Sequence, residues 1–167
     1  MKLIERYFHS LVLLLTPTGM KRADYIRRKK LFGNMGKNST FMPRKLPLYS
    51  ELIRIGNNVH IASNVAFITH DIIHKMLNNK LVSEGGSALF KERKGFVEIM
   101  DNVFVGAGSS ILYNVKIGSN VIIAAGSIVT HNIPANSVVA GIPAKVIERF
   151  DHFLEKRLNE QLKDNKK

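Results

Sequence analysis

The sequence predicts a mainly β protein built as a parallel β-helix, with helical segments at both ends. The main observation is that an aliphatic residue returns every six positions from residue 99 onward. These residues are Ile99, Val105, Ile111, Ile117, Ile123 and Val129. Helices and ordinary strands repeat about every 3.6 and 2 residues. A period of six instead indicates a coil, in which each hexad forms one short side and directs its aliphatic residue toward the axis.

The other positions of the hexads suit tight corners between these sides. In the hexads that begin at 105, 111, 117 and 123, the second residue is small in three of the four, and the fifth is small or β-branched. Glycine and asparagine tolerate the left-handed dihedral angles that such corners use. The same phase is present earlier at Ile55, Ile61 and Phe67, and a weaker copy opens at Met35. We therefore predict that residues 33–147 form the coil.

The register breaks between Phe67 and Ile99, because steps of six from Phe67 lead to position 97. The intervening stretch is charged and contains Gly85-Gly86. Repeat proteins place such insertions as loops on one face, often the binding face. We expect about residues 71–96 to form a loop extruded from one turn of the coil.

Two flanking segments lie outside the repeat. Residues 1–32 are predicted to be helical, because apolar residues in 2–15 follow an i, i+3, i+4 pattern and a short basic helix follows at 23–31. Residues 148–167 are predicted to contain a helix from Asp151 to about Lys163. Its apolar stripe is Phe150, Leu154, Leu158 and Leu162. Both helical segments are expected to cover the open ends of the coil.

Composition excludes several classes of function. The 167 residues suit one domain, and the absence of cysteine excludes disulfides, thiolate metal sites and a cysteine nucleophile. A net charge of +12 is compatible with nucleic acid, an anionic membrane or a phosphorylated ligand. No nucleic-acid-binding motif is present, so nucleic acid is not the expected partner.

The apolar run 11–15 is too short to span a bilayer. We expect a cytoplasmic protein, and peripheral contact of the basic N-terminus with the inner membrane face stays open.

Three segments carry a family resemblance: residues 55–71, residues 103–109, and residues 123–130 running on to 139–147. The most specific parts are Thr69-His70-Asp71 before the insertion and the ending Gly141-Ile142-Pro143-Ala144-Lys145. The chain resembles the hexapeptide-repeat acyltransferases, in the branch of O-acetyltransferases that modify sugars and surface polysaccharides. The resemblance implies a left-handed coil and a homotrimer with active sites between subunits, closed by the extruded loop. It also implies acetyl-coenzyme A as co-substrate, a sugar or glycan acceptor, and no metal.

Acyl transfer to a hydroxyl needs a base near neutral pH, and histidine is the usual one. His70 lies where the last hexad before the insertion meets the loop, and it matches the catalytic histidine of the family. His74 is the main competitor. Asp71 is one candidate to orient the His70 ring.

The resemblance also assigns binding residues. Ala107 and Ala125 match backbone contacts to the pantetheine arm, Thr130 and His131 lie at the next corner, and Lys145 matches a basic residue that meets the cofactor phosphates. Enzymes of this family that act on maltose or galactosides use an asparagine and an aspartate for the acceptor. The asparagine is missing here near Met42, so simple-sugar specificity does not carry over. Glu51 and Asp71 are the candidate acceptor-binding residues.

Two other classes of function remain open at this point. The γ-type carbonic anhydrases share the fold and hold zinc through three histidines at subunit interfaces. His60, His70 and His74 are the candidate ligands here, although their spacing does not resemble that family. A non-catalytic β-helix scaffold is the second alternative. Metal analysis tests the first, and a titration with coenzyme A tests the second.

Overall fold

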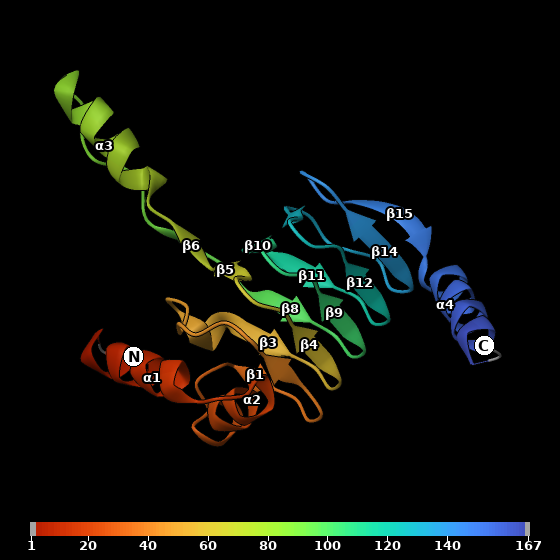
Figure 1. Cartoon of the computed structure of the whole chain (residues 1–167). Helices are drawn as coiled ribbons and strands as arrows, with labels where there is room; N and C mark the ends of the chain where they lie inside the picture. Colours follow the sequence, from red (N-terminus) through yellow and green to blue (C-terminus); the bar gives the residue numbers. More distant parts are fainter. Residues whose placement is uncertain (1–2, 166–167) are drawn as a thin grey trace.

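The computed structural model describes residues 3–165. The outermost residues of the two predicted terminal segments, 1–2 and 166–167, lie outside the described residues. Short strands stack into a coil, with helices at both ends and an arm that projects from one turn (Figure 1). The predicted mainly β class with terminal helices is confirmed.

Three sheets form the sides of the coil. Sheet 1 contains β1 (Asn34–Met35), β3 (Ile53–Ile55), β8 (Val97–Ile99) and β11 (Val115–Ile117). Sheet 2 contains β2 (Thr40–Phe41), β4 (Val59–Ile61), β9 (Val103–Val105), β12 (Val121–Ile123), β14 (Ser137–Ala140) and β15 (Lys145–Arg149). Sheet 3 contains β5 (Ala66–Ile68), β10 (Ser110–Leu112) and β13 (Ile128–Val129). Val97 pairs in parallel with Val115, and Val103 with Val121, so one turn of the coil takes three hexads.

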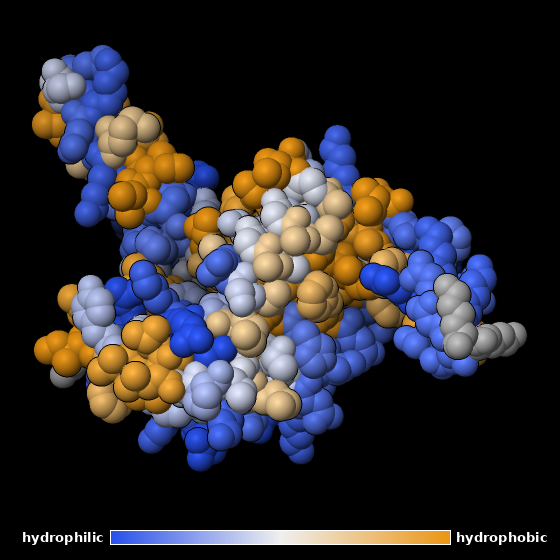
Figure 2. Space-filling view, in the orientation of Figure 1, coloured by the Kyte–Doolittle hydropathy of each residue, from blue (hydrophilic) through white to orange (hydrophobic). Residues whose placement is uncertain are grey.

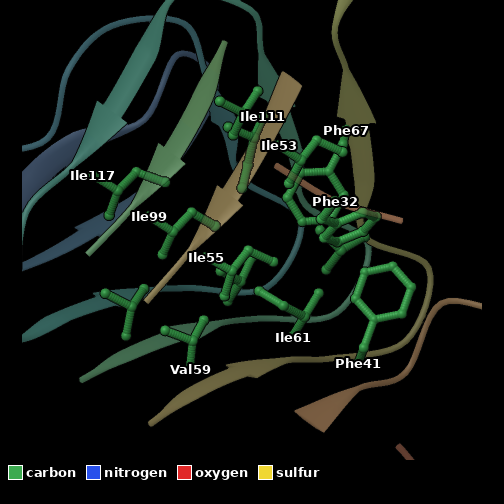
Figure 3. Packing of buried hydrophobic residues seen from close by; sticks show 14 of the residues in the cluster. Phe32, Phe41, Ile53, Ile55, Val59, Ile61, Phe67, Ile99, Ile111 and Ile117 are labelled. Atoms are coloured by element: carbon green, nitrogen blue, oxygen red, sulfur yellow. The ribbon is translucent and has the colours of Figure 1, made fainter. Parts of the chain in front are cut away.

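The core is a column of aliphatic side chains along the coil axis (Figure 3). The aliphatic residues of the six-residue period are all buried, with exposed fractions of 0–2%. Burial of one such side chain contributes about 1.5–3 kcal/mol to folding. Toward the N-terminal end, the core is filled by the rings of Phe32, Phe41 and Phe67, whose centroids lie 5.4–6.5 Å apart.

The corner between sheets 1 and 2 is built from asparagines. Asn58, Asn102, Asn120 and Asn136 have φ between 53° and 59°, the left-handed region that asparagine tolerates. Their side-chain amides form a ladder up the coil, in which each amide donates to the next at 3.0, 3.0 and 2.8 Å. This ladder joins successive turns of the coil along its exposed corner.

Two helices cover the N-terminal end of the coil. α1 (Leu3–Leu15) is followed by α2 (Gly19–Arg28), which packs against β1 and β2. α2 begins at Thr18, whose hydroxyl accepts a hydrogen bond from the backbone N–H of Lys21 at 3.3 Å. Arg22 is fully buried and donates from Nε to the Phe41 carbonyl at 2.9 Å and from Nη1 to the Thr16 carbonyl at 2.6 Å.

At the other end, the expectation that the terminal helix covers the coil is wrong. α4 (Phe150–Asp164) contacts only β14 and β15 to any extent, and none of its residues is buried. Its stripe residues Leu154, Leu158 and Leu162 are 46–58% exposed. β15 instead pairs in antiparallel fashion with β14 and satisfies its edge hydrogen bonds, which leaves α4 beside the coil (Figure 1).

The insertion is not the plain loop that the sequence predicts over about residues 71–96. β6 (His70–Asp71) and β7 (Arg93–Lys94) form an antiparallel ribbon, and α3 (Ile73–Ser83) lies beyond it. Through this ribbon, the insertion forms backbone hydrogen bonds of its own. We call residues 69–96 the arm. A short 3-10 turn, η1 (Ser50–Leu52), precedes β3 near the base of the arm. In residues 3–165, no helix is both long enough and apolar enough to cross a bilayer.

Truncation of the axial column should destabilise the fold. We expect Ile117→Ala to lower the free energy of unfolding by about 2–5 kcal/mol, because it leaves a cavity between stacked turns. Ile147→Ala is the matched control, since Ile147 is 63% exposed, and its effect should stay within about 0.5 kcal/mol. Denaturant titration at one protein concentration measures both, and equal effects would contradict the assignment of the core.

Candidate functional site

His70 lies at the corner between sheets 3 and 1, where the arm leaves the coil. It is half-buried and pairs across the ribbon with Lys94. The ring of Tyr49 packs edge-on against its imidazole, with centroids 5.2 Å apart and planes at 77°. The Nδ1 atom of His70 is buried and has no hydrogen-bond partner among the described residues. This imidazole is therefore held by ring packing rather than by a hydrogen bond to Nδ1.

A carboxylate that the sequence analysis missed lies beside this ring. The hydroxyl of Tyr49 lies 3.0 and 2.9 Å from the two carboxylate oxygens of Glu92, and Lys94 Nζ lies 3.1 Å from Glu92 Oε2. Lys94 Nζ also lies 3.9 Å from the centroid of the Tyr49 ring. Burial raises the pKa of Glu92, but the hydrogen bonds from Lys94 and Tyr49 outweigh it and hold the pKa below its usual range. Tyr49 therefore links the His70 ring to an anionic carboxylate.

Asp71 is engaged elsewhere and does not orient His70. Its Oδ2 accepts from the Tyr113 hydroxyl at 2.5 Å, and its Oδ1 accepts from the Ile73 backbone N–H at 3.0 Å. The hydrogen bond from Tyr113 is the main cause that lowers the pKa of Asp71 and raises the pKa of Tyr113. Successive side chains of a strand point to opposite faces, so Asp71 points away from the face of His70.

Asp71 and Tyr113 line a small pocket at the base of the arm. Its volume is about 190 Å³, and it also contains Arg93 and His74. The Nδ1 atom of His74 is buried without a hydrogen-bond partner in residues 3–165. Glu51, the other candidate for acceptor binding, has an exposed side chain on η1. Glu92 is connected to His70 through Tyr49, whose hydroxyl bonds the carboxylate and whose ring packs on the imidazole.

Ala107 and Ala125 lie at the corner between sheets 2 and 3, one turn apart, and both are exposed. The backbone N–H of Gly126 donates to the Ala107 carbonyl at 2.9 Å, and that of Gly108 donates to Ser63 at 3.0 Å. We call the stack of Ser63, Ala107 and Ala125 the small-residue corner. A Cβ at Gly106 would lie 2.4 Å from the Ala125 nitrogen, so glycine is required there. The corner exposes backbone along a narrow path that suits a chain of amides.

The remaining predicted residues fall into two places. Lys145 is exposed at the start of β15, and the backbone N–H of the adjacent Ala144 bonds the Ile128 carbonyl at 2.8 Å. Lys145 therefore lies near the C-terminal end of the small-residue corner. Thr130 and His131, whose Oγ1 and Nδ1 atoms are 2.7 Å apart, lie at the other edge of sheet 3, at the same corner as His70. Within one chain, the width of sheet 3 separates His70 from the small-residue corner.

The candidate zinc ligands do not converge. His60 lies on sheet 2, with Nδ1 3.2 Å from Thr40 Oγ1 and Nε2 3.1 Å from Asn58 Oδ1. Residues 3–165 contain no group of three histidine, cysteine or acidic side chains arranged to hold a metal ion. Within one chain, these three histidines therefore do not form a metal site in the described residues.

Comparisons with known proteins agree with the repeat and the coil. The family model for the bacterial transferase hexapeptide (six repeats) matches residues 96–131. A solved maltose O-acetyltransferase from Clostridium difficile 630 is 29% identical, with a TM-score of 0.60 over 87% of this chain and 86% of that one. These similarities support the hexapeptide-repeat acyltransferase family for this chain.

Other relatives of this acyltransferase point the same way. YvoF of Bacillus subtilis (strain 168), which is named an acetyltransferase, is 28% identical over 98% of this chain and 84% of its own length. CapG of Staphylococcus aureus is 38% identical over a stretch that covers 64% of this chain and 58% of CapG. A galactoside acetyltransferase solved in complex with coenzyme A is 27% identical, with a TM-score of 0.57 over 88% and 80% of the two chains.

The hydrogen bonds of the two carboxylates give a crossed test. Tyr49→Phe removes a donor to Glu92, so the pKa of Glu92 should rise toward its ordinary value while that of Asp71 stays unchanged. Tyr113→Phe should raise the pKa of Asp71 toward its ordinary value and leave that of Glu92 unchanged. Carboxyl ¹³C chemical shifts followed against pH measure both groups. A Glu92 pKa that responds to Tyr113→Phe rather than to Tyr49→Phe would contradict the geometry.

Proposed function

We propose that the protein is an acetyl-coenzyme A-dependent O-acetyltransferase that acts on a hydroxyl of a sugar or a surface-polysaccharide precursor, with His70 as general base. The observation that carries the proposal is the half-buried imidazole, with a buried Nδ1 that lacks a partner, linked through Tyr49 to the anionic Glu92. The similarity to a maltose O-acetyltransferase and to a galactoside acetyltransferase bound to coenzyme A supports the reaction class and the co-substrate.

In this proposal, His70 accepts the proton of the acceptor hydroxyl while that oxygen attacks the thioester carbonyl. The new C–O bond forms, the C–S bond breaks, and His70 returns the proton to the departing thiolate. Tyr49 holds the His70 ring through its edge-on contact, and Glu92 in turn fixes Tyr49 through its hydroxyl. The chain has no cysteine, so no thioester enzyme intermediate is available, and in this proposal the transfer is direct within a ternary complex.

We further propose a left-handed coil assembled as a homotrimer. Three outward residues of sheet 1 are charged, namely Arg54, Glu98 and Lys116, and Arg54 pairs with Glu98 at 3.0 Å. Sheets 2 and 3 instead carry apolar outward side chains at Phe104, Ile122, Ile68 and Ile128, beside the polar His60 and Ser110. Two sides with apolar outward residues suit a prism that packs against two copies of itself.

A trimer also accounts for the distance between His70 and the small-residue corner. The two lie on opposite edges of sheet 3, so a neighbouring subunit can present its small-residue corner to His70. We propose that Ala107 and Ala125 bind the pantetheine arm through backbone groups and that Lys145 meets the phosphates. Thr130 and His131 share the corner of His70, so we assign them to the side of the cleft that carries the base. The arm, extruded from a single turn of the coil, then covers this intersubunit cleft.

His70→Ala should lower turnover by about 10²–10⁴-fold and leave the affinity for acetyl-coenzyme A unchanged, because the proposed base does not hold the cofactor. His74→Ala is the matched control, as a nearby histidine with a similarly buried Nδ1. Initial rates measure turnover, and calorimetric titration measures cofactor affinity. Near-wild-type activity in His70→Ala would remove His70 from the mechanism. An equal loss of turnover in His74→Ala would contradict the assignment of His70, rather than His74, as the base.

We also propose that the protein is cytoplasmic and lies peripherally on the inner membrane face through α1. Two polar residues of α1 face the protein: His9 Nδ1 lies 2.8 Å from the Tyr25 hydroxyl, and Ser10 Oγ accepts from the Leu46 N–H at 3.1 Å. The exposed side of α1 carries one acidic residue, Glu5, and the large apolar residues Leu3, Ile4, Tyr7, Phe8, Leu11, Leu14 and Leu15. They form an apolar patch over α1 (Figure 2). Lys21 and Arg28 line a groove with Leu15, and such a combination suits an anionic bilayer surface.

Leu11→Asp should abolish binding to phosphatidylglycerol vesicles, because it places a charge in the apolar stripe of α1. The matched control is Leu158→Asp, on the exposed stripe of α4, where Leu158 is 54% exposed against 53% for Leu11. Vesicle flotation measures the binding, with phosphatidylcholine vesicles as the neutral comparison. Flotation of Leu11→Asp at the wild-type level would refute this surface.

A further inference from the structure

A second pocket lies at the N-terminal end of the small-residue corner. It has a volume of about 540 Å³ and is lined by residues 42–47 and 63–67. Ser63 belongs both to this pocket and to the small-residue corner, where its carbonyl accepts from the Gly108 N–H at 3.0 Å. The pocket and the path past Ala107 and Ala125 therefore form one continuous surface.

The charges in and behind this pocket are all positive. Arg44 and Lys45 line it with exposed side chains, and none of the described residues that line it is acidic. Arg22 is fully buried directly behind it, with Nη2 3.5 Å from the sulfur of Met42, which also lines the pocket. Burial, and then the positive charge of Arg44, lower the pKa of Arg22.

The partners of Arg22 make this arrangement unusual. Its guanidinium bonds two carbonyl oxygens and a thioether, and in residues 3–165 no carboxylate pairs with it. A buried cation without a counter-ion is costly unless hydrogen bonds or an external anion offset its charge. An anion in the pocket would oppose the charges of Arg22, Arg44 and Lys45 together.

We propose that this pocket binds a negatively charged group, a carboxylate or a phosphate ester, on the acetyl acceptor. This inference rests on the proposed function and names its class of acceptor. Lys145 marks the phosphate end of the cofactor path, so the acyl group lies toward the opposite end, where the pocket opens. Arg44 has the planar fork that matches carboxylate and phosphate oxygens. Met42 offers no donor to a neutral sugar hydroxyl at this place.

Three acceptors and two variants test the proposal. Glucuronic acid carries a carboxylate, glucose 6-phosphate carries a phosphate ester, and glucose carries neither. One or both charged acceptors should show a KM at least about tenfold below that of glucose, and which one does so identifies the anionic group. Arg44→Gln and Lys45→Gln should each raise that KM about tenfold and leave the KM for glucose unchanged.

Lys75→Gln is the matched control, because it removes the same charge from α3 in the arm. Arg44 also donates to the Leu14 carbonyl at 2.8 Å, so Lys45→Gln supplies the variant that leaves this bond in place. Equal KM values for charged and neutral acceptors, or unchanged values in both variants, would overturn the proposal.

Calorimetric titration of the wild-type protein with each charged acceptor separates this proposal from the proposed function. Saturable binding that Lys45→Gln weakens, without release of coenzyme A in any assay, would support the anion site and contradict the acetyltransferase. Release of coenzyme A with all three acceptors, without a preference for the charged ones, would support the acetyltransferase and contradict the anion site. Absence of saturable binding by either charged acceptor would overturn the anion site whatever the activity.

Discussion

The close stacking of backbone on backbone at the corners of the coil is the constraint on which the rest of the structure depends. One turn of three hexads brings Gly106 against Ala125 so tightly that no side chain fits, and it brings four asparagine amides into one ladder. The same stacking aligns Ser63, Ala107 and Ala125 into one path along the coil. It also sets the width of sheet 3, which separates that path from His70. Cofactor path and proposed base thus lie on different edges of one sheet.

The sequence predicted those features that a local period determines. The axial residues, the corner glycines and the place where the arm leaves the coil all follow from steps of six. The partners of His70 could not be predicted in the same way. The β6–β7 pairing places Glu92 near His70, and the Tyr49 hydroxyl then bonds Glu92. Both contacts join residues far apart in the sequence, and neither follows a repeat. Asp71 follows His70 in sequence, yet alternation along the strand turns it toward Tyr113. The packing of α4 could not be predicted either. Its apolar stripe predicts a helix but does not indicate which surface packs against that stripe.

The arm therefore does more than a covering loop would. It supplies Glu92 and Lys94 to one face of its ribbon and Asp71 and Arg93 to the other. In the account proposed here, the cleft has a direction. Lys145 meets the cofactor phosphates at one end, the small-residue corner guides the amide chain, and the cationic pocket at Arg44 and Lys45 holds the acceptor at the other end. His70 of an adjoining subunit completes the reacting centre.

A mixed-trimer experiment tests this shared site most directly. His70→Ala removes the base, and Ala125→Trp blocks the cofactor path, so each variant alone should be inactive. When the two are co-expressed, random assembly gives about half of the sites a competent base and about half a competent path, so about one quarter of wild-type activity should return. Activity no higher than that of the separate variants, in trimers shown to contain both chains, would contradict a site built from two subunits.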